Sequence, residues 1–397
     1  MSETESTLQQ WFNLKYQNYT LTPKYNEEHR KFFARRNIKD NNIDNHLKIF
    51  DRDLTAGITP KRLYYGNAGS GKSHIMLYVG DHLKSKNYEV CYMECPPLKT
   101  TDMPIMLFKE FVKGYGRQKI VDVFQKSYLG LMSKAQASDP ELWQNPKLRA
   151  FELLKNEYDD NSLIEILATY VQEATNHPQI HRWLDGEKIK SEIPIDDLTS
   201  NTTTLAKVWV VILKLIYKIT GKKLVLIFDE LDNMNQIPEK SWIQFTHIFQ
   251  QLTEDSQAYA AIVLCFTGES RTDNEIINEH VIRRILESNI IQIDEIKPQE
   301  FSGFCEDLIR FNRDEVHKSG EESCTKYQSE TSGEELLPKY YPFTTKSLEN
   351  IKAIKGKSKP GDIINTLNQA CAEAKANGRH VVRSDDAAAV AQAKKIL

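Results

Sequence analysis

The fold class of this chain is decided by eight consecutive residues, Gly66-Asn67-Ala68-Gly69-Ser70-Gly71-Lys72-Ser73. They match the pattern G-x-x-x-x-G-K-[ST] in full, and glycines at these spacings let successive backbone N–H groups face inward around a polyphosphate. Lys72 is expected to reach the β- and γ-phosphates, and the Ser73 hydroxyl is expected to ligate Mg²⁺. The alternative is an ordinary glycine-rich turn.

The residues on either side of this loop favour phosphate binding over a simple turn. Arg62–Tyr65 predicts a short strand before the loop, and an amphipathic helix is predicted to begin near Lys72. Glu89–Met93 then predicts a second strand, which completes a βαβ unit. A strand before the loop and a helix after it are the context in which this pattern binds phosphate.

Three further apolar runs complete the expected sheet. Leu224–Phe228 and Ala260–Phe266 show no alternation, which is typical of central strands covered on both faces, and Ile290–Ile293 is shorter. A helix is predicted before the first of these runs, over Thr204–Thr220, and Gly221 is placed to end it. The chain is therefore predicted to form an α/β fold with a parallel five-stranded sheet.

Two carboxylates, Asp229 and Glu230, end the first of these apolar runs. They are predicted to lie at the carboxyl edge of the sheet, where α/β proteins bind ligands. Asp229 suits the Mg²⁺ shell, and Glu230 suits the polarisation of a water for in-line attack on a γ-phosphate. A strand that ends in solvated acids is the alternative, but the phosphate loop favours catalysis. Asp232 is expected to be a cap or an exposed acid.

The loop GNAGSGKS and the strand end LVLIFDELDNM together resemble the nucleotide motifs of AAA+ and related P-loop ATPases, especially replication initiators of the origin-recognition type. The order of elements over residues 40 to 397 resembles that group too. Trp183-Leu184-Asp185-Gly186 and the helix before the acidic strand are also similar to prokaryotic ATPases of phage-defence operons and transposition. The resemblance implies that another strand lies between those carrying the two motifs, and that a helical lid follows the sheet.

The resemblance also implies roles for residues outside the two motifs. Thr267 matches by position a polar residue that contacts the γ-phosphate or the attacking water; a turn residue before Gly268 is the alternative. Arg283 and Arg284 lie where family members offer an arginine finger to a neighbouring subunit, and they could equally be surface arginines.

The lid of such ATPases carries a further arginine, and this chain departs from that pattern. Gly361 stands at the expected place, within the stretch GKSKPGD. Lys357 or Lys359 could substitute as a point charge, although lysine lacks the planar bidentate fork of arginine. Slow or partner-dependent hydrolysis is the expected consequence.

The organisation along the chain suggests three parts. Residues 1–55 are expected to be an N-terminal helical segment, 56–295 the P-loop ATPase core with a helical insertion at about 101–200, and 296–397 a helical lid domain. The Ser-, Glu- and Gly-rich stretch at about 318–338 is predicted to be a mobile loop. The acidic half of the insertion, residues 151–200, is interpreted as a solvated helix face.

Composition excludes several classes of protein and narrows the choice of partners. The 397 residues include 52 Lys and Arg, 55 Asp and Glu, and 40% apolar residues, which excludes collagen-like, mucin-like and wholly disordered chains. A net charge of −3 supplies no global field toward nucleic acid or anionic lipid, so such a partner requires a local patch. The basic stretch Arg30–Arg36 is interpreted as an amphipathic helix, and a contact with nucleic acid is the less favoured alternative.

The cysteines and the missing targeting signals indicate where the protein acts. Six scattered cysteines fit a reducing compartment, and Cys91 with Cys95 is interpreted as core rather than as a zinc site. No stretch resembles a signal peptide or a membrane span. A cytoplasmic protein with no membrane partner is expected.

These observations favour one function and leave another open. The first is an ATP- and Mg²⁺-dependent ATPase switch that forms a homo-oligomer and acts on DNA or a DNA-bound protein complex. The second is a nucleotide-gated signalling or scaffold protein with little turnover, which the missing lid arginine and the acidic insertion favour. A small-molecule kinase is a distant third.

Overall fold

The computed structural model describes residues 7–19, 37–38, 41–95, 104–138, 177–187, 198, 202–236, 239–256, 258–313, 320–355 and 358–396. The chain divides into two compact units. The sheet unit comprises Leu47–Tyr65 and Val79–Ile291, and the C-terminal unit comprises Met1–His46, Gly66–Tyr78 and Gln292–Leu397. The phosphate loop therefore groups with the C-terminal residues.

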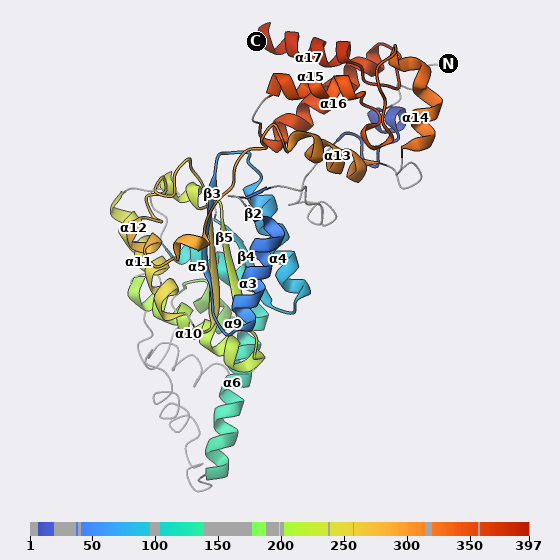
Figure 1. Cartoon of the computed structure of the whole chain (residues 1–397). Helices are drawn as coiled ribbons and strands as arrows, with labels where there is room; N and C mark the ends of the chain where they lie inside the picture. The colour runs from blue at the N-terminus through green and yellow to red at the C-terminus, as the bar shows by residue number, and fades with distance from the viewer. Residues whose placement is uncertain are drawn as a thin grey trace. The chain divides into compact units, whose positions relative to one another are not determined.

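All five predicted strands form one parallel sheet (Figure 1). They are β3 (Lys61–Gly66), β4 (Glu89–Glu94), β5 (Leu224–Asp229), β6 (Ala260–Thr267) and β7 (Ile290–Gln292), in the order β4-β5-β6-β3-β7. The expected α/β fold is confirmed. So is the strand between the two motifs, since β6 lies between β3, which leads into the phosphate loop, and β5, which ends in Asp229.

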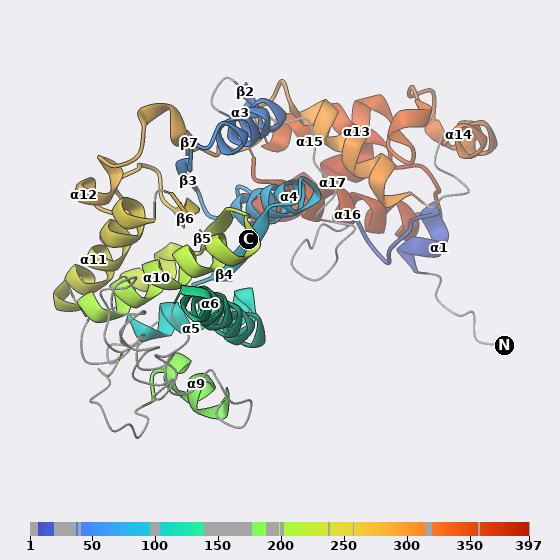
Figure 2. The ribbon, with the colours of Figure 1, turned by 90° about the horizontal axis from the view of Figure 1, so that it is seen from below.

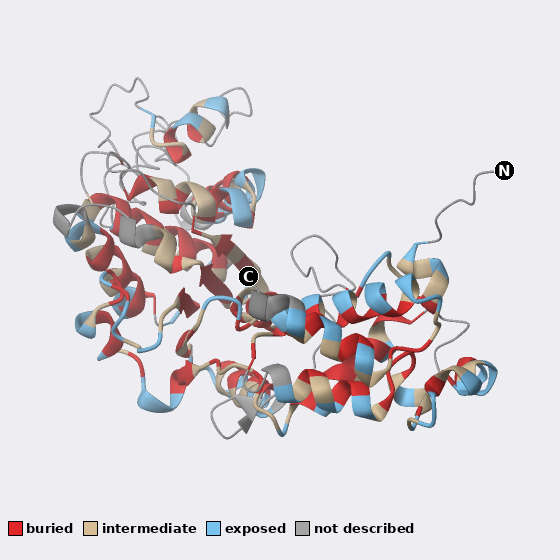
Figure 3. Ribbon diagram, turned by 90° about the horizontal axis from the view of Figure 1, so that it is seen from above, coloured by how far each residue is buried: buried red, intermediate tan, exposed pale blue. Residues whose placement is uncertain are grey.

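Helices cover both faces of this sheet, which explains why its central strands are continuously apolar. Every residue of β5 is buried, and Figure 3 shows the central strands as buried. In Figure 2, α3 (Ile43–Thr55) and α4 (Lys72–Ser85) lie on one face, and α10 (Thr202–Thr220) and α11 (Glu239–Asp255) lie on the other. Trp209 of α10 and Phe249 of α11 pack on Phe228 of β5, with ring centroids 6.0 and 5.2 Å away.

Shorter elements complete the sheet unit. Part of the predicted insertion is helical, as α5 (Ile105–Tyr115), α6 (Arg117–Ser138) and α9 (His177–Leu184); residues 139–176 lie outside the described residues. A 3₁₀ helix, η3 (Leu231–Gln236), follows β5, while α12 (Glu279–Ile282) and η4 (Glu287–Asn289) precede β7. Gly221 ends α10 with φ of 68°, as its position predicts.

The C-terminal unit is a helical bundle with its own core. It contains α13 (Phe301–Asn312), α14 (Glu321–Tyr327), α15 (Thr345–Lys355), α16 (Pro360–Ala376) and α17 (Ser384–Ile396), and the N-terminal helix α1 (Leu8–Phe12) belongs to it. Two short 3₁₀ helices, η6 (Gln328–Thr331) and η7 (Pro338–Tyr340), precede α15. Phe12, Leu14 and Tyr19 share a buried cluster with residues of α13 and α16.

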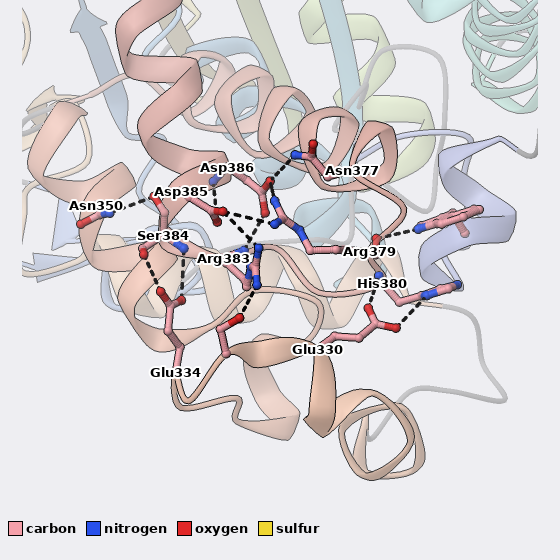
Figure 4. Close-up of polar contacts among 12 residues, drawn as sticks. Glu330, Glu334, Asn350, Asn377, Arg379, His380, Arg383, Ser384, Asp385 and Asp386 are labelled. Carbon is pink, nitrogen blue, oxygen red and sulfur yellow. Dashed lines mark hydrogen bonds and ion pairs between the residues drawn. The ribbon is translucent and has the colours of Figure 1, made fainter.

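Polar contacts hold the start of α17 in this bundle (Figure 4). The buried carboxylate of Asp386 pairs with Arg379, and Asp385 pairs with both Arg379 and Arg383. Ser384 donates its backbone N–H to Glu334, 3.1 Å away. Buried charges of this kind are stable only when their lone pairs are satisfied, so these contacts fix the end of the bundle.

Two features differ from the sequence-based expectation. The stretch 318–338 is not simply a loop, because from Gly320 onward it contains α14 and η6, whose Cys324 packs with Leu336, Tyr341 and Val381 in a buried cluster. Those sparse apolar residues gain partners from distant segments. A two-stranded hairpin, β1 (Asn37–Ile38) with β2 (Asn41–Asn42), was not predicted.

Among the described helices, none is both long and apolar enough to cross a membrane.

Candidate functional site

The phosphate loop has the conformation that its sequence predicts. It follows β3 directly, and α4 begins at Lys72, so Ser73 lies in the first turn of that helix. Gly69 and Gly71 adopt φ of 79° and 91°, a region that side chains rarely tolerate. Lys72 is buried, and its ammonium donates to the carbonyl oxygens of Gly66 and Asn67 at 3.0 and 2.9 Å. The backbone carbonyl groups of the phosphate loop therefore hold the Lys72 ammonium in place.

Two glycines of this loop, Gly66 and Gly69, are closely packed against residues of the C-terminal unit. A Cβ on Gly66 would lie 2.3 Å from the carbonyl oxygen of Ile293, and a Cβ on Gly69 would lie 3.2 Å from Cδ of Lys359. Lys359 immediately precedes α16, and Ser358 beside it exchanges backbone hydrogen bonds with Ile296 at 2.9 and 3.1 Å. The stem of Lys359 thus lies against the phosphate loop within the C-terminal unit.

The other positions considered for the missing arginine are Gly361 and Lys357. Gly361, which stands where an arginine is expected, lies in the first turn of α16, with open space around its Cα. Lys357 lies outside the described residues. Of the two lysines considered from the sequence, the structure describes one, and it packs on the loop.

In the sheet unit, Asp229 is held firmly at the end of β5. It is buried, and its Oδ2 accepts a hydrogen bond from the Tyr92 hydroxyl of β4 at 2.7 Å. Its Oδ1 accepts the backbone N–H of Glu230 at 2.9 Å. Burial, reinforced by the charge of Asp229, raises the pKa of Tyr92, so the phenol stays protonated and donates. Tyr92 is a positioning residue that the sequence analysis missed.

Glu230 has a backbone conformation that is rare for its residue type. Its φ is 56°, in the left-handed region, where a Cβ approaches the following carbonyl. The amide of Asn233 donates to Glu230 Oε2 at 3.1 Å and to the Cys95 carbonyl at 2.8 Å. Strained backbone of this kind is concentrated at functional sites, and Asn233 fixes the direction of the carboxylate.

Asp232 connects the ends of two neighbouring strands. Its Oδ1 accepts the backbone N–H of Thr267, the last residue of β6, at 2.9 Å. Asp232 was expected to be a cap or an exposed acid. In the structure its carboxylate caps a backbone N–H at the end of a strand and not at the end of a helix. The contact brings Thr267 beside the segment that carries Glu230.

The two arginines after β6 differ in their surroundings. Helix α12 ends at Ile282, so both arginines follow it instead of lying on it. The Arg283 side chain is 74% exposed and pairs with Glu279 at 2.9 Å. Arg284 is 30% exposed, pairs with Glu254 and also donates to the His280 carbonyl. Arg283 is therefore the more exposed of the two side chains.

The donor groups fit a magnesium ion brought by a nucleotide. Among the described residues, no three His, Cys, Asp or Glu side chains gather into a metal-binding group. Mg²⁺ commonly takes one or two protein oxygens and completes its shell with phosphates and waters. A buried carboxylate such as Asp229 accepts two hydrogen bonds here and retains lone pairs for a further ligand.

Among the described residues, the two cysteines considered from the sequence occupy core positions. Cys91 and Cys95 are buried free thiols whose pKa is raised by burial, as in a core position. Trp183 is buried, and Asp185 pairs with Arg117. The stretch Arg30–Arg36 lies outside the described residues.

The comparisons with known proteins found similar solved structures, all of low sequence identity. Similar solved structures include the ORC2 protein of Aeropyrum pernix in ADPNP and ADP complexes (TM-score 0.45, 11% identity, 88% of this chain and 66% of that chain). They also include CDC6P of Pyrobaculum aerophilum (TM-score 0.43, 12% identity, 85% and 63%) and A. pernix ORC1 in complex with DNA (TM-score 0.43, 10% identity, 88% and 63%).

The chain thus spans slightly less than two thirds of the length of these proteins. No protein-family model matches the sequence, and no curated protein matches it. The fold assignment rests on the sheet order and the phosphate loop described above.

Proposed function

We propose that this chain binds ATP with Mg²⁺ and hydrolyses it slowly, as an oligomerising molecular switch that acts on DNA or a DNA-bound protein complex. The observation that carries the proposal is the phosphate loop, with its buried lysine and left-handed glycines between β3 and α4. The DNA partner and the cytoplasmic location come from the sequence and its resemblance, and they stay predictions.

Each part of the chain has a distinct role in this proposal. Backbone N–H groups of Gly66–Ser73 surround the phosphates, and Lys72 neutralises the β- and γ-phosphates. Ser73 and Asp229 hold the metal ion, which neutralises charge on the phosphates when bound. Glu230, directed by Asn233, accepts the proton of the attacking water. Thr267 contacts the γ-phosphate or that water.

Two basic side chains, Lys359 and Arg283, are assigned supporting roles in hydrolysis. Lys359, packed on Gly69, supplies the lid charge in place of the expected arginine. Because lysine binds phosphate as a point charge without a bidentate fork, weaker coupling and slow turnover follow. Arg283 is the better candidate for a finger toward a neighbouring subunit, since its side chain is more exposed than that of Arg284.

Glycine at position 361 favours a second function, a nucleotide-gated scaffold with little turnover. The two functions are separated by phosphate release from the purified chain and from Glu230→Gln. The first predicts measurable turnover that falls by about 10²–10⁴-fold in the mutant, with ATP affinity retained. Turnover that is equal in both proteins favours the scaffold.

A further inference from the structure

A cavity of about 500 Å³ opens in the sheet unit, at the amino end of β3. Its lining comes from three segments: the end of α3 with the loop after it, the first residue of β3, and the turn before β7. The phosphate loop follows the opposite end of β3, and of the candidate ATPase residues only Arg284 lines this cavity.

Exposed apolar side chains form part of its lining. In the part of the chain that the structure describes, four large apolar side chains are more than half exposed: Ile58 (57%), Leu129 (54%), Ile243 (72%) and Leu286 (71%). Ile58 and Leu286 both line this cavity. Single exposed apolar side chains are normal on protein surfaces, but exposed apolar side chains grouped at one cavity indicate a surface that binds another molecule.

The cavity also carries positive charge. Arg52, Lys61 and Arg284 line it, and Asp53 is the one lining carboxylate. Asp53 lies 3.3 Å from Arg52, and Arg284 is paired with Glu254 behind the lining. Lys61 forms no ion pair within the described ranges, and burial, opposed by Glu254 and aided by Arg284, lowers its pKa. Because Glu254 only partly offsets the desolvation of this ammonium, an incoming carboxylate stabilises it further.

We propose that this cavity binds an acidic peptide segment of a partner protein. A carboxylate of that segment meets Lys61, and an adjacent aliphatic side chain covers Ile58 and Leu286. The lining favours a peptide over nucleic acid, since it contains no aromatic side chain on which a base could stack. This interaction is independent of the proposed ATP chemistry.

The test uses an array of twelve-residue peptides in which leucine stands next to aspartate or glutamate at every spacing. Matched peptides carry asparagine or glutamine in place of each acid. The best binder is then labelled, and its Kd is measured by fluorescence anisotropy. The full-length chain is expected to prefer acidic peptides over the matched amides, with affinity that falls as salt rises.

Lys61→Glu and Leu286→Ser are each expected to weaken binding at least tenfold. Ile243→Ser, which removes an equally exposed side chain outside the cavity, is the matched control and should leave the Kd unchanged. Unfolding midpoints identify variants that fail to fold, and Lys61→Gln replaces Lys61→Glu in that case. No preference for acidic peptides, wild-type affinity in the folded Lys61 variant, or stronger binding of a DNA oligonucleotide overturns the proposal.

Discussion

Glu230 combines a catalytic assignment with a strained backbone, and the two can be separated by substitution. Glycine has no Cβ, so Glu230→Gly relieves the left-handed strain at φ 56°, which costs other residues about 1–2 kcal/mol. Glycine also makes the unfolded chain more flexible, at a cost of about 0.4–1 kcal/mol. Relative to alanine, glycine at this position is therefore expected to stabilise the fold by about 1 kcal/mol.

Glu230→Ala is the matched control, because it also removes the carboxylate and its contact with Asn233 but keeps a Cβ. Thermal unfolding without nucleotide should place the midpoint of the glycine variant about 1–2 °C above that of the alanine variant. Both variants should lose about 10²–10⁴-fold in phosphate release. An alanine variant as stable as the glycine variant, or wild-type turnover in either one, would refute the reasoning.

Three further substitutions test the surrounding residues. Tyr92→Phe removes one of the two donors to the buried carboxylate of Asp229 and should cost about 1.5–3 kcal/mol in unfolding free energy by denaturant titration. Tyr88→Phe, which removes the hydrogen bond of a partly exposed tyrosine to the Asp51 carboxylate, should cost less than about 1 kcal/mol. Arg283→Ala should depress hydrolysis more than Arg284→Ala while sparing ATP binding, and mixing with subunits that cannot bind ATP should partly restore it; no recovery argues against a finger in trans. Lys359→Ala should weaken ATP roughly fivefold in a calorimetric titration, a loss of about 1 kcal/mol, and leave ADP unchanged. Equal losses for both nucleotides would remove Lys359 from the γ-phosphate.

Local patterns were sufficient to predict the sheet and the phosphate loop. The run Leu224–Phe228 lacks alternation because both faces of β5 are covered, and this signal is present in the sequence itself. The glycines at positions 69 and 71 likewise indicate a left-handed backbone conformation, which the structure shows at both positions. Such features depend on residues that are close in the chain, so sequence reasoning finds them.

Contacts between distant segments could not be predicted in this way. Tyr92 reaches Asp229 because the register of β4 and β5 pairs Glu94 with Asp229, which places Tyr92 on the same face. The packing of Lys359 on Gly69 depends in the same way on where α16 begins. For α14, composition predicted a loop, since its few apolar residues are buried only by tertiary partners.

The central claim is that the loop at residues 66–73 binds ATP, and a titration of the full chain with a fluorescent ATP analogue in Mg²⁺ tests it most directly. Lys72→Ala should weaken binding by at least about thirtyfold, because the phosphates lose a buried cation worth roughly 2 kcal/mol or more. Lys84→Ala, on the exposed end of the same helix, should bind as the wild type does. A folded Lys72→Ala protein with unchanged affinity would contradict the account.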